Sequence, residues 1–201
     1  MRDYDFGLRR LHSLLGIIPI GLFVTQHLIV NHFATGGEEA FNKASGFMGN
    51  LPFVNWLEWF IIYIPLMFHA FFGLYIAFTS KPNVNRYSTY RNWMFLLQRI
   101  TGVFLVIFIA WHIWQTRIQK ALGTEVDFDM MADIFSSPLM VAFYVVGVVS
   151  ATFHFANGFW SFLVTWGVTQ SQRSQRISTY VMTVLFIALS VIGIRAIFAF
   201  V

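Results

Sequence analysis

The sequence contains no cysteine and few charged residues. Without a thiolate, this chain cannot by itself build a disulfide framework or ligate an iron–sulfur cluster, so any iron it binds must be held by histidine. Charged residues make up 11% of the 201 positions and hydrophobic residues 57%, and a soluble domain of this size could not cover so much apolar surface. The composition therefore predicts an integral membrane protein.

Uncharged runs between the charges are long enough to cross a bilayer, since ~20 helical residues at ~1.5 Å each span ~30 Å. Helix is expected because lipid offers no partner for open backbone groups and the runs are too long for barrel strands. Residues 1–201 are thus expected to form a single all-α transmembrane domain, with Pro19 and Pro65 kinking its first two spans. The five expected spans are about residues 11–33, 59–80, 95–116, 138–166 and 177–200.

The basic residues are unevenly placed, and this predicts the orientation. Two loops, at residues 33–58 and 117–133, carry seven of the nine acids. Nine of the 13 basic residues lie on the opposite side: Arg2, Arg9, Arg10, Lys81, Arg86, Arg91, Arg99, Arg173 and Arg176. The positive-inside rule then places the N-terminus of this multi-pass membrane protein in the cytoplasm and its C-terminus outside. The net charge of +4 reflects this topology, and no nucleic-acid partner is expected.

Four histidines lie inside four different apolar runs, where an imidazole needs a partner: His27, His69, His112 and His154. Alternate spans cross the membrane in opposite directions, so the position of a histidine along its span gives its depth in the bilayer. About 15 residues place His27 ~22 Å above the inner end of its span, and His112 lies in the outer half of a parallel span. His69 and His154 share the inner layer.

Two histidine pairs at two depths, each drawn from two helices, suit six-coordinate haem iron, which takes one imidazole on each face of the porphyrin. We therefore expect the first four helices to form a bundle around two stacked haems. His27 and His112 would hold the outer iron, and His69 and His154 the inner iron. Three glycines near the inner layer leave room for a flat ring, although small residues also serve ordinary helix packing: Gly16, Gly73 and Gly158.

Polar residues at the inner end of the first and third spans are candidates to hold the propionates of an inner haem, which need cationic or hydroxyl partners. These candidates are His12, Ser13, Arg9, Arg10 and Arg99. The alternative is that the arginines are topology anchors whose charged ends reach the interface.

Several segments carry a resemblance that covers essentially the whole chain: RRLHSLLG, QHLIVNH, IPLMFHAFFG, YRNWMFLLQRITG, IAWHIW and VSATFHFANGFWSF. They resemble the dihaem cytochrome b subunits of succinate:menaquinone oxidoreductases of the Gram-positive type. The resemblance implies a location in a bacterial cell membrane, five helices, two b haems, and the same histidine pairs that the depths indicate.

The resemblance also implies partners and a reaction. A flavoprotein subunit with covalently bound FAD oxidises succinate, and an iron–sulfur subunit on the cytoplasmic face passes electrons to this membrane anchor. The chain would then be the electron-transfer subunit of a succinate dehydrogenase, carrying electrons through the two haems to menaquinone near the outer face. Candidates for the quinone site, which needs a proton-exchanging group, are Glu58 first, then Asn31 and His32. Glu58 is equally compatible with a solvated carboxylate at a helix N-terminus.

The main alternative is the cytochrome of a menaquinol-oxidising fumarate reductase, which runs the same electron path in reverse. A related branch of dihaem fumarate reductases uses a membrane glutamate two residues before the last ligand histidine, where this chain has Thr152. A proton-coupled transporter is disfavoured because the spans lack buried acids, and a haem-free structural anchor because all four ligand positions are histidine.

Overall fold

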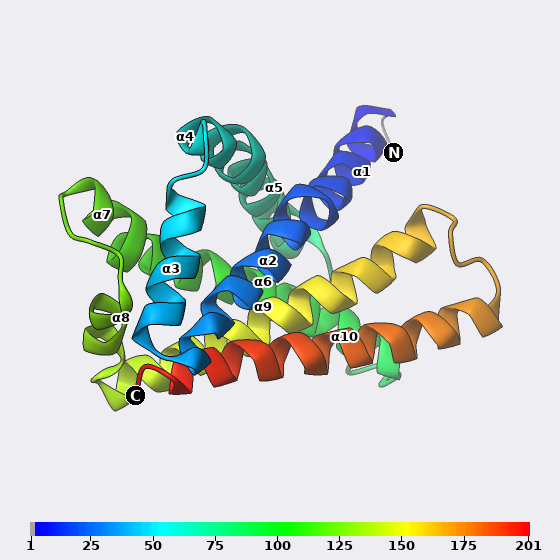
Figure 1. Ribbon diagram of the computed structural model, residues 1–201. Helices are drawn as coiled ribbons and strands as arrows, with labels where there is room; N and C mark the ends of the chain where they lie inside the picture. The colour runs from blue at the N-terminus through cyan, green and yellow to red at the C-terminus, as the bar shows by residue number, and fades with distance from the viewer. Residues whose placement is uncertain (1–2) are drawn as a thin grey trace.

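The computed structural model describes residues 3–201, with side chains from Asp5 onward, and this range contains helices but no strand (Figure 1). Arg2, which counts among the basic residues of the orientation argument, lies outside it. Five helical segments are long and apolar enough to cross a membrane: Asp5–Gly36, Val54–Thr79, Tyr90–Ala121, Pro138–Thr165 and Gln172–Phe198. The prediction of an all-α membrane fold with five spans is confirmed.

The first three spans are each built from several helical pieces. The first contains α1 (Asp3–Ile17), α2 (Pro19–His32) and η1 (Phe33–Gly36), and it divides at Pro19, which cannot donate a backbone hydrogen bond. The second contains α4 (Val54–Leu57), the π-helical η2 (Glu58–Tyr63) and α5 (Ile64–Thr79), with Pro65 in the first turn of α5. The third contains α6 (Tyr90–Ile113), the π-helical η3 (Trp114–Ile118) and α7 (Gln119–Ala121).

The fourth and fifth spans are single helices, α9 (Pro138–Thr165) and α10 (Gln172–Phe198). They pack along each other, and α10 also packs on α2. Thr152, which is fully buried, hydrogen-bonds Ser190 across the two helices at 2.7 Å. Gly193 permits the close approach, because a Cβ there would lie 2.6 Å from Val148 Cγ1. Small and hydroxyl-bearing residues thus join the fifth helix to the bundle, as is common where lipid supplies no hydrophobic driving force.

Both acidic loops contain a helix that the sequence analysis did not anticipate. These helices, α3 (Glu38–Gly49) and α8 (Phe128–Phe135), lie at the end of the bundle where the C-terminus also lies, opposite the N-terminus (Figure 1). We call this end the cap end. Asn42 of α3 accepts a hydrogen bond from the Phe128 backbone N–H at 2.8 Å, and Phe41 packs against Phe200 with ring centroids 5.0 Å apart. The buried hydrophobic cluster of the described chain accordingly includes Phe41 of α3 and Met131 and Phe135 of α8.

Gly147 permits close packing of α9 on α6, because a Cβ at this position would lie 2.2 Å from a Phe108 ring carbon. Gly147→Ala should therefore force Phe108 to move and lower the stability of the detergent-solubilised protein by about 1–3 kcal/mol, the usual range for overpacking. Thermal unfolding measures this loss. Gly46→Ala in α3 is the matched control, because a Cβ there meets nothing within 4 Å. Equal melting temperatures for the two variants would contradict the packing described here.

Candidate functional site

The structure brings the four intramembrane histidines together in two pairs. His27 of α2 lies beside His112 of α6, with ring centroids 5.7 Å apart and ring planes at 75°. His69 of α5 lies beside His154 of α9, with centroids 6.2 Å apart and planes at 85°. These are the pairs expected from depth along the spans. Each pair joins two helices that are not consecutive spans.

The donor set of each pair fits a six-coordinate iron in a macrocycle. Two metal–nitrogen bonds of about 2 Å, together with the half-widths of two imidazoles, separate the ring centroids by about 6 Å. No cluster of three or more His, Cys, Asp or Glu side chains with metal-binding geometry forms within residues 3–201. Each pair can thus supply two ligands, and the remaining coordination positions would need a non-protein ligand such as a porphyrin.

Backbone carbonyls orient the rings of the pair nearer the N-terminal end. Nδ1 of His69 lies 2.9 Å from the carbonyl oxygen of His12, and Nδ1 of His154 lies 3.2 Å from that of Gln98. A carbonyl oxygen only accepts, so in both rings Nδ1 carries the proton and donates it. The lone pair is then on Nε2, which is the protonation state that an imidazole needs to bind a metal.

Side chains contact the rings of the pair nearer the cap end. Nδ1 of His112 lies 3.4 Å from the Tyr144 hydroxyl. Asn31 donates its amide N–H to the backbone carbonyl of His27 at 2.8 Å, and the same amide nitrogen lies 3.4 Å from Nε2 of that ring. Asn31, proposed from the sequence as a quinone contact, therefore lies directly beside a candidate metal ligand.

Glycines allow the imidazoles to approach neighbouring helices. A Cβ on Gly16 of α1 would lie 2.5 Å from Cε1 of His69, and a Cβ on Gly102 of α6 would lie 3.0 Å from Cε1 of His154. Gly16 is one of the three glycines expected from the sequence near the inner layer, whereas Gly102, the last residue of the segment YRNWMFLLQRITG, was not predicted to approach a histidine. Gly73 and Gly158, expected to face a flat ring, lie against the side chains of His12 and Gln98.

His12 belongs to the same cluster as the pair nearer the N-terminal end. Its ring stacks on that of His69, with centroids 4.1 Å apart and planes at 5°. Its Nε2 is buried and has no hydrogen-bond partner in the described part of the chain. A buried polar atom without a partner is costly, so this nitrogen fits a role toward a bound group such as a haem propionate.

The other propionate candidates have partners within the protein. Arg9 forms an ion pair with Asp5 at 3.2 Å, and the Arg10 guanidinium lies over the rings of Phe6 and Trp166 at 5.0 and 5.3 Å. Two candidates contact neighbouring spans. Ser13 accepts a hydrogen bond from Trp166 at 3.1 Å, and Arg99 donates to Ser80 at the end of α5. These contacts agree with the alternative that the arginines anchor the helix ends at the interface.

Two further quinone candidates are also engaged by the protein. Glu58, the first residue of η2, accepts two hydrogen bonds from Arg117 of η3, at 2.8 and 3.0 Å. Nδ1 of His32 donates to the Ile192 carbonyl of α10 at 3.1 Å. The Glu58–Arg117 ion pair joins the two π-helical segments, and such segments are frequent at functional sites.

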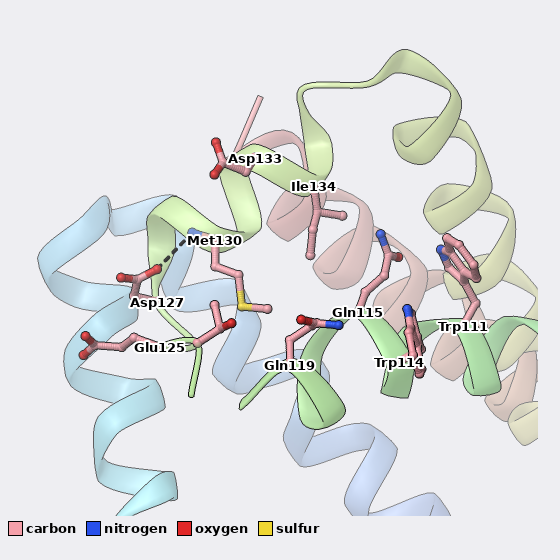
Figure 2. Close-up of a pocket in the computed structure, with 10 residues that line it drawn as sticks. Trp111, Trp114, Gln115, Gln119, Glu125, Asp127, Met130, Asp133 and Ile134 are labelled. Atoms are coloured by element: carbon pink, nitrogen blue, oxygen red, sulfur yellow. Dashed lines mark hydrogen bonds between the residues drawn. The ribbon is translucent and has the colours of Figure 1, made fainter. Parts of the chain in front are cut away.

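A pocket with a volume of about 570 Å³ lies at the cap end, beside the helix that carries His112. None of Glu58, Asn31 and His32 lines it. Figure 2 shows Gln119 and Met130 on facing sides of it, with Gln115, Trp114 and Trp111 along α6 and η3. Its remaining lining residues come from α8 and the segment before it: Thr124, Glu125, Asp127, Asp133 and Ile134. Sequence reasoning missed the pocket because α8 completes it.

Two comparisons connect this architecture to known proteins. The family described as "Succinate dehydrogenase/Fumarate reductase transmembrane subunit" matches residues 78–193. The "Succinate dehydrogenase cytochrome b558 subunit" of Bacillus subtilis (strain 168) is 60% identical over 197 residues, which cover 98% of each chain. The match to the Bacillus subtilis protein covers nearly the whole chain, which includes all four paired histidines. This multi-pass membrane protein belongs to the family of succinate dehydrogenase and fumarate reductase transmembrane subunits.

Proposed function

We propose that this chain is the membrane-anchor cytochrome b subunit of a succinate dehydrogenase, and that it carries electrons through two haems to a quinone. The observation that carries the proposal is the arrangement of two imidazole pairs at two depths of one helical bundle. The relative's name assigns that protein to succinate dehydrogenase, and its near-full-length match favours this reading over a fumarate reductase.

In this proposal His69 and His154 bind one haem iron and His27 and His112 bind the other. Bound b haems supply one-electron redox chemistry between the two faces of the membrane. The protein holds the ligand rings: the carbonyls of His12 and Gln98 fix two of them, and Tyr144 and Asn31 contact the other two. The buried Nε2 of His12 is proposed to bind a propionate.

The N-terminal end of the bundle is proposed to face the cytoplasm and to receive electrons there. Arg9, Arg10 and Arg99 lie at this end, in agreement with the positive-inside rule. An iron–sulfur subunit would dock on this face and connect the chain to a flavoprotein subunit that holds FAD. The cap end would then face the outside.

The cap-end pocket is proposed to bind the quinone, with menaquinone as the substrate. Its volume of about 570 Å³ lies within the usual range for small-molecule sites. Trp111 and Trp114 offer aromatic faces for a flat ring, and Gln115 and Gln119 offer amide donors for its carbonyl oxygens. Glu125 makes no hydrogen bond or ion pair with the described side chains and is proposed to exchange protons with the outside. Glu58, held by Arg117, is proposed as a second such group.

Ligation of the two haems by two different histidine pairs predicts that each haem can be removed without the other. His112→Ala should remove one haem and leave the other, and His69→Ala should remove the complementary one, because each variant deprives only one pair of a ligand. A redox-titrated absorption spectrum of the purified complex distinguishes the two. His32→Ala is the control, since its ring bonds Ile192 and lies outside both pairs. Two haems surviving in His112→Ala would refute the assignment.

The pocket assignment predicts a quinone-specific defect. Trp114→Ala should raise the KM for a menaquinone analogue by up to about tenfold, because an aromatic contact is worth about 0.5–1.5 kcal/mol. Haem content should be unchanged, and steady-state kinetics with the analogue measures the effect. Trp56→Ala, which removes an exposed tryptophan outside the pocket, is the control. A normal KM in Trp114→Ala, with Glu58→Gln impaired instead of Glu125→Gln, would move the site to the Glu58–Arg117 pair.

Electron flow toward the outside should be electrogenic. Related fumarate reductases have a membrane glutamate at the position of Thr152, and a threonine offers no carboxylate for compensating proton transfer. The Thr152 hydroxyl instead donates to carbonyls of its own helix and contacts Ser190. Moving one charge across the membrane is worth about 2.3 kcal/mol per 100 mV. An inside-negative potential in vesicles should therefore accelerate succinate-dependent quinone reduction, and an uncoupler should slow it. A rate that ignores the uncoupler would argue against this charge movement.

A further inference from the structure

Tyr144 of α9 links one of the paired histidines to the cap-end pocket. Its hydroxyl lies 3.4 Å from Nδ1 of His112 and 3.0 Å from Oε1 of Gln115. Gln115 in turn lines the pocket. A continuous series of polar groups thus runs from a candidate metal ligand, through one buried phenol, to the wall of a cavity.

The proton positions in this series follow from the acceptors. The Tyr144 hydroxyl has one proton, and it donates that proton to the carbonyl oxygen of Gln115, which can only accept. The lone pairs of the phenol oxygen are then available to Nδ1–H of His112. This tautomer leaves the Nε2 lone pair of His112 for a metal.

The Tyr144 ring is held firmly in place. The residue is 4% exposed, and its ring makes edge contacts with Phe108 and Phe135 at centroid distances of 5.4 and 4.9 Å. It also meets the His112 ring edge-on at 5.8 Å. Packing on several sides keeps the hydroxyl at one position relative to the imidazole, which a tuning contact requires.

The rings of His69 and His154 differ from that of His112 in the kind of acceptor that Nδ1 meets. Nδ1 of His69 and Nδ1 of His154 donate to backbone carbonyls. A side-chain substitution cannot remove those acceptors. At His112 the acceptor is a side-chain hydroxyl, so its contribution can be removed while the backbone and the ring packing are kept.

We propose that Tyr144 is a positioning residue that lowers the reduction potential of the iron bound by His112, and that Gln115 extends this control to the pocket wall. The inference rests on the proposed haem ligation by His112. A ligand imidazole that donates its second N–H becomes more basic and donates more electron density to the metal. Oxidised iron gains more from this donation than reduced iron, so the hydrogen bond favours the oxidised state.

Tyr144→Phe removes the hydroxyl and keeps the ring. We expect the haem of the His27–His112 pair to become easier to reduce by up to about tenfold in equilibrium constant, an upward shift of up to ~59 mV for a one-electron couple. The potential of the other haem should not change. Redox titration of the purified complex, followed by haem absorption, measures both. Tyr180→Phe, which alters an exposed tyrosine of α10, is the matched control and should shift neither.

Gln115→Leu removes the acceptor of the hydrogen bond from Tyr144 and keeps the tyrosine itself. It should shift the same haem upward by less than Tyr144→Phe, because the phenol then lacks the acceptor that polarises it. An unchanged potential of this haem in Tyr144→Phe would overturn the proposal. If Tyr144→Phe fails to assemble, an unchanged potential in Gln115→Leu would do so. Either result leaves haem ligation intact, whereas retention of both haems in His112→Ala would refute the ligation itself.

Discussion

The hydrogen bond that a buried imidazole makes through its second nitrogen is the constraint on which the rest of this structure depends. In the hydrocarbon layer no water can satisfy a ring N–H, so an acceptor on a neighbouring residue stabilises a buried ring and fixes its orientation. His69 and His154 find backbone carbonyls on other helices, of His12 and Gln98. These bonds fix the ring orientation and require the helices to approach closely, which explains the need for glycine at positions 16 and 102.

The two ends of the bundle differ in ways that suit different tasks. At the N-terminal end, Arg10 lies over aromatic rings and Arg99 donates to Ser80 at the end of α5, and in the proposed function this end receives a partner protein. At the cap end, α3 and α8 cover the helices, an ion pair joins two π-helical segments, and a pocket opens beside the helix of His112. In the proposed function this asymmetry separates electron entry from quinone chemistry by the thickness of the membrane.

Much of the fold was predictable because hydrocarbon imposes strong rules on sequence. Charges mark the limits of the spans, and a fixed rise per residue converts sequence position into depth, which places His27 level with His112 and His69 level with His154. The cap helices were not predictable in the same way. α8 has only 8 residues and is defined by its Asp127 N-cap and by contacts of Met131 and Phe135 with the buried cluster. The pocket and the contact of Tyr144 with His112 depend on these tertiary contacts.

The sequence by itself determined that the chain spans a membrane five times as helices and that its histidines lie at two depths, since burial in lipid permits few alternatives. Only the tertiary structure decided what surrounds each ring. Rotation and crossing of the helices set whether a residue faces a ligand, lipid or another helix, and these depend on side-chain packing between distant segments. That packing stacks His12 on His69, pairs Glu58 with Arg117, and positions the phenol of Tyr144 between His112 and Gln115.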